Sequence, residues 1–190
     1  KDAPARCSIE LIRAHLDRPV MRAVDAKLCA DQCSDGQPYA CVATGLLHEE
    51  GKLLAKDSKK AAELLEKACV GAYVPGCTHM AERWVAKKDP AKDAEDAEPF
   101  FEKACEQKDF RACWQLGELL VKWDGGAQGA PPLTKACDGG VAKACSRLGL
   151  VYFQGDGVTK DQPRGLALYQ KACDGGDGRG CTNWGDALEF

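Results

Sequence analysis

Cysteine is the residue with the most obvious chemistry in this chain of 190 residues, which contains twelve. Thiols in such number could form disulfides, bind metal ions or act as nucleophiles. Ten of them form five pairs in which seven residues separate the two cysteines: Cys33 and Cys41, Cys69 and Cys77, Cys105 and Cys113, Cys137 and Cys145, Cys173 and Cys181. A spacing this regular indicates one structural role repeated along the chain.

The cysteine pairs recur with a nearly fixed period. Their first members lie 36, 36, 32 and 36 residues apart, and Lys-Ala-Cys recurs at the last four of them. A small residue stands four positions after each second cysteine: Gly45, Ala81, Gly117, Gly149 and Gly185. Such a period is typical of solenoid repeats. The third repeat is four residues short, and its stretch 125–132 predicts a distorted turn and a shortened second helix.

Each repeat is predicted to contain two helices. The first begins near the second cysteine, because large residues follow at helical spacing. An aspartate sixteen positions after that cysteine, at Asp57, Asp93 and Asp161, is placed to cap the second helix, which ends at Lys-Ala-Cys. The sequence therefore predicts an all-α solenoid. Its expected parts are an N-terminal helical cap over 1–32 and repeats over 33–68, 69–104, 105–136, 137–172 and, in part, 173–190.

The same spacing predicts disulfides. It puts one cysteine at the end of a helix and its partner at the start of the next, and a short turn between antiparallel helices brings such positions within disulfide reach. Cys7 and Cys29 fall outside the pattern. Two helices turning near residues 17–19 would bring them together as a sixth bridge, although Cys29 and Cys33 are one helical turn apart and a swapped pairing stays open.

Metal binding and catalysis both lack their usual motifs. A zinc site needs four converging ligands, but no C-x2-C occurs, and His15, His48 and His79 hold no repeated position. We therefore expect no metal and no cofactor, with His48 and His79 packed or exposed on helices. Ser-x-x-Lys, Lys-Thr-Gly, Gly-x-Ser-x-Gly and His-Glu-x-x-His are absent. The sequence predicts no catalytic residue, and it predicts a turn at Gly155-Asp156-Gly157.

The amino-acid composition limits the kinds of partner and the cellular compartment that we expect for this protein. The net charge is only −3, with 26 basic and 29 acidic side chains, so nucleic acid is not an expected partner. No apolar run approaches the roughly 18 residues of a membrane span, so membrane insertion is not expected. Six disulfides favour an oxidising compartment.

The repeated positions resemble the Sel1-like repeat family, a relative of the tetratricopeptide repeats. The best match is Leu148-Gly149, Tyr152, Gly155-x-Gly157-Val158, Asp161, Ala167, Tyr169 and Lys171-Ala172-Cys173. The resemblance covers residues 33–190, and the cysteine pairs are similar to those of the subgroup typified by the Helicobacter cysteine-rich proteins. It implies a right-handed α/α solenoid that acts as an adaptor or scaffold in the periplasm or outside the cell, with the mitochondrial intermembrane space as an alternative. Similar members are credited with penicillin binding and weak β-lactamase activity.

If the geometry resembles that of tetratricopeptide repeats, the first helices line a concave face. The binding residues then expected are Tyr39, Arg111, Trp114, Glu118, Lys143, Leu150, Phe153 and Arg179. Arg111, Lys143 and Arg179 would form a basic ladder suited to an acidic peptide or a C-terminal carboxylate. Trp114 and Phe153 would offer apolar anchors. The alternatives are that the basic residues only solvate the surface and that Trp114 packs under the turn of the third repeat.

The leading hypothesis is a monomeric, non-catalytic scaffold that binds a protein or peptide segment on this face. One alternative is a penicillin-binding protein with weak β-lactamase activity. Another is a structural spacer in a larger envelope protein. The sequence stops inside the first helix of a fifth repeat, which predicts either a capping helix or a fragment of a longer array.

Overall fold

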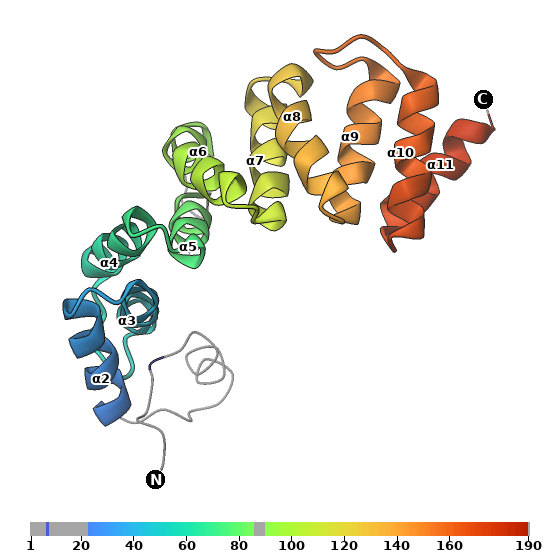
Figure 1. Cartoon of the computed structure of the whole chain (residues 1–190). Coiled ribbons are helices and arrows are strands. Elements are labelled where there is room, and N and C mark those ends of the chain that lie inside the picture. Colours follow the sequence, from blue (N-terminus) through green and yellow to red (C-terminus); the bar gives the residue numbers. More distant parts are fainter. Residues whose placement is uncertain (1–6, 8–22, 86–89, 190) are drawn as a thin grey trace. The chain divides into compact units, whose positions relative to one another are not determined.

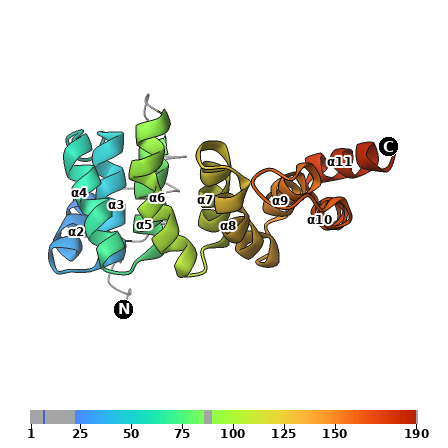
Figure 2. The ribbon, with the colours of Figure 1, turned by 90° about the horizontal axis from the view of Figure 1, so that it is seen from above.

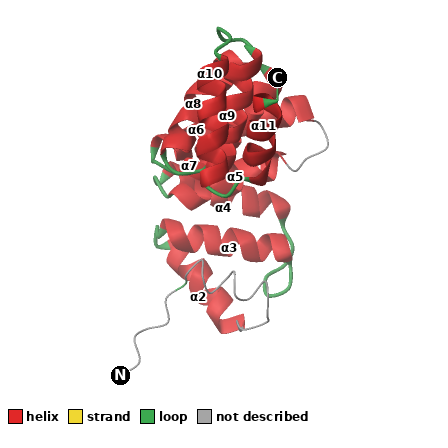
Figure 3. Ribbon diagram, turned by 90° about the vertical axis from the view of Figure 1, so that its right-hand side faces the viewer, coloured by secondary structure: helices red, strands yellow, loops and turns green. Residues whose placement is uncertain are grey.

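The structure is a computed structural model that describes residue 7 and residues 23–85 and 90–189 (Figure 1). The chain divides into two compact units, residues 1–86 and residues 87–190. Across the described residues the regular elements are all helices (Figure 3). None of these helices is long and apolar enough to cross a membrane.

The first unit consists of helices that each pack on the next in chain order. They are α2 (Ala23–Ser34), α3 (Pro38–Glu50), α4 (Ser58–Val70) and α5 (Val74–Val85). Helices α3 and α5, the first helices of two repeats, also contact each other. Leu47 and Leu65 are fully buried between α3 and α4 and form the centre of this core. Burial of each such side chain contributes about 2 kcal/mol.

The second unit continues the same alternation of second and first helices. It contains α6 (Pro90–Glu106), α7 (Phe110–Trp123), α8 (Gly126–Asp138), α9 (Ala142–Gln154), α10 (Gln162–Asp174) and α11 (Gly178–Leu188). Phe101, Leu133 and Leu148 are buried in its core. The first helix α9 lies against both α7 and α11 as well as against its own second helix α10 (Figure 2).

The small residues of the first helices α7 and α9 are explained by close helix packing. A Cβ atom on Gly149 would lie 2.7 Å from the Tyr169 ring and 3.1 Å from the carbonyl oxygen of Gly165, both on α10. Gly117 is enclosed in the same way by Leu133 of α8. Real Cβ atoms do not come this near to other atoms, so α9 and α10 can approach only because this position lacks a side chain.

Two of the three expected aspartate caps are confirmed. Asp57 accepts a hydrogen bond from the backbone N–H of Lys60 (2.9 Å), and Asp161 accepts one from the backbone N–H of Arg164 (3.0 Å). The third expectation is wrong, because α6 begins at Pro90 and Asp93 lies within the helix. Proline suits the first helical position, since its fixed φ is helical and that position needs no N–H.

The shortened third repeat has lost its residues from the turn and not from the helix. Helix α8 has 13 residues, as many as α4 and α10, so the expected shortening of the second helix is wrong. The connection between α7 and α8 is reduced to Asp124 and Gly125. Gly125 makes this reversal with φ of 87°, a left-handed value that glycine adopts without a steric penalty. Pro131 and Pro132 lie inside α8 without ending it.

All twelve cysteines form disulfides, and the pairs are those expected. The five repeated bridges join residues eight apart, with Cα–Cα distances of 4.6, 4.5, 4.6, 4.7 and 4.5 Å. The sixth joins Cys7 to Cys29, with a Cα–Cα distance of 5.1 Å, so the swapped pairing through Cys33 is not formed. The turn expected near residues 17–19, and His15, lie outside the described residues.

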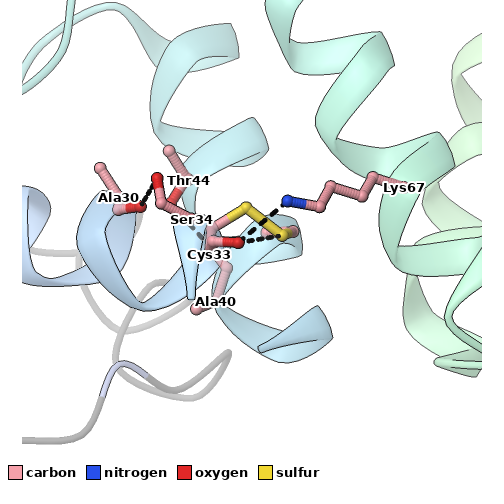
Figure 4. Close-up of a disulfide and its surroundings, with 7 residues drawn as sticks. Ala30, Cys33, Ser34, Ala40, Thr44 and Lys67 are labelled. Atoms are coloured by element: carbon pink, nitrogen blue, oxygen red, sulfur yellow. Dashed lines mark hydrogen bonds between the residues drawn. A yellow bond between two sulfur atoms is a disulfide. The ribbon is translucent and has the colours of Figure 1, made fainter. Parts of the chain in front are cut away.

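The lysine of the recurring Lys-Ala-Cys motif connects neighbouring repeats. Lys67, in the last turn of α4, donates a hydrogen bond from Nζ to the carbonyl oxygen of Cys33 at the end of α2 (3.1 Å; Figure 4). Lys171 of α10 makes the corresponding contact with a carboxylate oxygen of Asp138 at the end of α8 (3.1 Å). A cation at the carboxyl end of a helix is favoured by the helix dipole. At Lys67 and Lys171 the motif thus links α4 to α2 and α10 to α8.

Candidate binding groove

A groove of about 320 Å³ crosses the first helices α7, α9 and α11 of the second unit. It lies on the side of α9 at which α7 and α11 both contact this helix. Its lining residues are Glu118 from α7, Lys143, Ser146, Arg147 and Leu150 from α9, and Gly178, Arg179, Thr182 and Asn183 from α11. The groove is therefore built by three successive repeats.

Four of the residues predicted from the sequence lie together in this groove: Glu118, Lys143, Leu150 and Arg179. Lys143 and Arg179 stand two positions before the second cysteine of their repeats, and Glu118 and Leu150 stand five positions after it. Lys143 and Leu150 are seven residues, or about two helical turns, apart on α9, so their side chains share one face of that helix. The repeat register alone brings these residues together.

The remaining predicted residues lie elsewhere. Arg111 is exposed at the start of α7 and does not line the groove. Phe153 packs against α10, where its ring centroid is 5.9 Å from that of Tyr169 and its Cβ occupies the space left by Gly165. Tyr39 belongs to the first unit, and its hydroxyl lies 3.4 Å from Oε1 of Gln32 on α2.

Trp114 lies beside the groove under the side chain of Lys143. The Lys143 ammonium is 5.5 Å from the centroid of the indole ring, which is within the range of a cation–π contact. The indole is partly buried, and its Nε1 makes no hydrogen bond to any residue that the structure describes. The indole of Trp114 on α7 therefore contacts the side chain of Lys143 on α9.

The sequence-based prediction missed Ser146, Gly178 and Thr182, and it also missed two residues with larger polar side chains, Arg147 and Asn183. Both stand two positions after the second cysteine, a position that the comparison with tetratricopeptide repeats left out. A signal was present, because this position is also polar in the preceding repeats, at His79 and Gln115. Arg147 lies with Nε 3.6 Å from a carboxylate oxygen of Glu118, which joins α9 to α7.

The charges of the groove favour an anionic group. Three basic side chains, Lys143, Arg147 and Arg179, face the single carboxylate of Glu118. Asp177 lies 4.0 Å from Arg179, but its other carboxylate oxygen accepts the backbone N–H of Gly180 and caps α11. Positive side chains on one partly enclosed surface attract carboxylates and increase the rate of association.

The groove offers binding groups and no assembled nucleophile. Ser146 lies three residues after Lys143, but the two side chains make no hydrogen bond to each other, which a nucleophile and its base require. The cysteines are all disulfide-bonded. Within the described residues no cluster of histidine, cysteine and carboxylate groups could hold a metal ion. His48 is buried and packed, with Nδ1 2.8 Å from the carbonyl oxygen of Ala55.

Comparison with known protein families identifies the repeat. The Sel1 repeat matches residues 38–69, 88–109 and 142–177. These segments cover α3 with nearly all of α4, the whole of α6, and α9 with α10. Curated proteins give no match.

Several solved structures share the fold. A protective antigen of uropathogenic Escherichia coli strains, described as displaying an SLR fold, is 22% identical over 84% of this chain, with a TM-score of 0.71. A Sel1 repeat protein from Oxalobacter formigenes is 24% identical over 80% of the chain, with a TM-score of 0.62. This chain covers only 35% and 63% of those two proteins. Helicobacter pylori cysteine rich protein B is 26% identical, with 67% of this chain and 94% of that protein covered and a TM-score of 0.50.

These likenesses confirm the expected all-α, right-handed α/α solenoid. They also agree with the resemblance to the Helicobacter cysteine-rich proteins, which has its counterpart among the solved structures. Together with the matched repeats, they show that the chain contains Sel1 repeats arranged in a solenoid of the Sel1-like repeat fold.

Proposed function

We propose that this protein is a non-catalytic scaffold that binds a segment of another protein in the groove of α7, α9 and α11. The observation that carries the proposal is the groove itself, because three repeats contribute side chains to one hollow of about 320 Å³. Sel1 repeats generally mediate contacts between proteins. A groove with this lining suits a side chain or a chain end and is too small for a folded domain.

The bound segment carries carboxylates, either as acidic side chains or as a free C-terminus. Lys143 and Arg179 occupy the same position in successive repeats, so they can contact two carboxylates of one extended segment. Leu150 adds an apolar contact between them, and Ser146, Thr182 and Asn183 add hydrogen-bonding groups. Arg147 can exchange its pairing with Glu118 for a ligand carboxylate, because the existing pair is 3.6 Å apart and leaves Nε without a hydrogen bond.

The compartment is oxidising, and we propose the periplasm or the cell exterior. Disulfides of this number persist where thiols are not kept reduced. Each repeated bridge closes a loop of about nine residues and stabilises the fold by about 2.5 kcal/mol in the chain-entropy estimate. A reducing cytosol would remove these five contributions together with that of the Cys7–Cys29 bridge.

The test is affinity capture from cell-envelope extract followed by mass spectrometry. The wild-type protein is compared with Lys143→Glu/Arg179→Glu and with Lys59→Glu/Lys60→Glu, which reverses the same number of charges on exposed α4. We expect the groove variant alone to lose its specific partner. Retention of every partner by the groove variant would refute the groove as the binding site.

A scaffold also differs from a β-lactam hydrolase in one simple assay. The proposed function predicts that purified protein, free of contaminating hydrolase, does not turn over nitrocefin. Turnover that co-purifies with the protein would instead support the penicillin-binding alternative.

A further inference from the structure

A second, larger hollow lies between the second helices α6 and α8 and the first helix α7 of the second unit. This cleft has a volume of about 710 Å³ and is formed by α6, α7 and α8. Its apolar part comes from Leu116 and Leu120 of α7 and from Pro131 and Pro132 of α8. Leu116 and Pro132 are buried, whereas Leu120 and Pro131 stay accessible. The volume is within the usual range of ligand sites.

The rim of this cleft is acidic. Glu98, Glu102 and Glu106 follow one another at intervals of four residues on α6, so they form a line about 12 Å long. Asp124, in the turn between α7 and α8, adds a fourth carboxylate, and Lys135 is the one basic residue of the lining. None of these four carboxylates forms an ion pair with a side chain that the structure describes.

The arrangement of the carboxylates indicates the kind of ligand. A metal ion needs several oxygen ligands within about 2.5 Å of one point. No group of carboxylates in the described residues converges in this way. Negative charges spaced along a helix beside an apolar surface suit a peptide segment with basic residues at intervals. Apolar side chains between those basic residues can then cover the apolar surface.

We propose that the cleft of α6, α7 and α8 is a second docking site, whose partner is a basic amphipathic peptide segment. The carboxylates on α6 pair with lysine or arginine side chains of the partner, and its apolar side chains cover Leu120 and Pro131. This site has the opposite charge preference from the groove and uses none of the same residues. It is therefore independent of the proposed function of the groove.

The protonation behaviour of the rim agrees with this docking site. Burial, together with repulsion from Asp124, Glu102 and Glu95, raises the pKa of Glu98 above its ordinary value. A raised pKa means that the negative charge at Glu98 is not compensated within the protein. A basic side chain placed beside Glu98 would remove that repulsion.

The experiment measures the fluorescence anisotropy of a labelled peptide made of three Leu-Lys-Lys-Leu repeats, titrated with the intact oxidised protein. Glu98→Lys/Glu102→Lys is compared with wild type and with Glu63→Lys/Glu66→Lys, which makes the same charge change on exposed positions of α4. We expect the cleft variant to weaken binding at least about tenfold and the α4 variant to change it less than about twofold. Circular dichroism confirms that each variant is folded.

Equal weakening by both variants would show adsorption to a generally negative surface and would overturn the proposal. So would full binding by the cleft variant. A labelled glutamate version of the peptide, with Leu-Glu-Glu-Leu repeats and titrated on its own, should bind the cleft variant no more weakly than wild type. The glutamate peptide is the ligand expected for the groove, and the lysine peptide is the ligand expected for the cleft. Loss of binding of either peptide therefore refutes one proposed site without affecting the other.

Discussion

Lys143 of α9 lies over the indole ring of Trp114 of α7, with its ammonium 5.5 Å from the ring centroid. The two residues come from successive repeats and stand near the start of their first helices. The contact places the Lys143 charge at the edge of the groove, and it also links α7 to α9.

This contact predicts a measurable coupling between the two side chains. In a double-mutant cycle with Lys143→Met and Trp114→Leu, we expect a coupling free energy of about 0.5–1 kcal/mol in unfolding by urea. The cation–π attraction is lost in either single variant, so the second substitution then costs less. Free energies that simply add would show that the two side chains do not interact.

Gly149 and Gly185 occupy the same position in their repeats and predict substitution effects of opposite sign. Gly149→Ala puts a methyl group against the Tyr169 ring, so we expect it to lower the free energy of unfolding by about 1–3 kcal/mol. A Cβ on Gly185 meets no atom within 4 Å. Gly185→Ala should therefore raise stability by up to about 1 kcal/mol, because alanine is the better helix former. Thermal unfolding of both variants measures this, and an equal effect at both glycines would contradict the packing described for α9 and α10.

The repeated disulfides predict a uniform contribution to stability. Cys137→Ser/Cys145→Ser and Cys173→Ser/Cys181→Ser each open a loop of the same sequence separation, 8 residues. We expect each pair of substitutions to cost about 2.5 kcal/mol in chemical unfolding. Thiol titration of the denatured, unreduced wild-type protein should find essentially no free thiol. One or more reactive thiols per chain would mean that a bridge is missing.

The raised pKa of Glu98 predicts a pH-dependent effect. Since the folded state holds this proton more tightly than the unfolded chain, Glu98 costs stability increasingly as the pH rises through its raised pKa. We expect Glu98→Gln to raise the free energy of unfolding at neutral pH by only a few tenths of a kcal/mol, because water still screens this half-buried carboxylate. The gain should vanish in acid, where Glu98 is protonated in both states. Glu63→Gln on α4 is the control, and a gain that persists in acid would contradict the assignment.

The repeated part of the fold is readable from the sequence because it depends on local spacing. Seven residues between cysteines fit a turn between two helices, and a small residue marks each close crossing, so the disulfides and the helix pairs follow directly. The third repeat is harder to predict, because the local spacing does not tell which part of the repeat is shorter. Its four missing residues could come from the turn or from α8, and glycine and proline suggest the helix. The turn was lost because Gly125 can reverse the chain within two residues.

The groove was only partly predictable, because its lining depends on contacts between helices, both within a repeat and between repeats. Phe153 stands at a position expected to face a ligand, yet it packs on α10 because Gly165 leaves room for it there. Arg147 lies one position outside the expected register, and its place in the groove depends on Glu118 of the preceding first helix. Neither contact can be read from the spacing within one repeat.

The central claim is that the groove of α7, α9 and α11 binds acidic segments. The most direct measurement is a titration of the labelled Leu-Glu-Glu-Leu peptide with wild-type protein, with Lys143→Glu/Arg179→Glu and with Lys59→Glu/Lys60→Glu. We predict saturable binding by the wild type and the α4 variant, and binding at least about tenfold weaker for the groove variant. Equal binding by all three proteins, or none by the wild type, would contradict the claim.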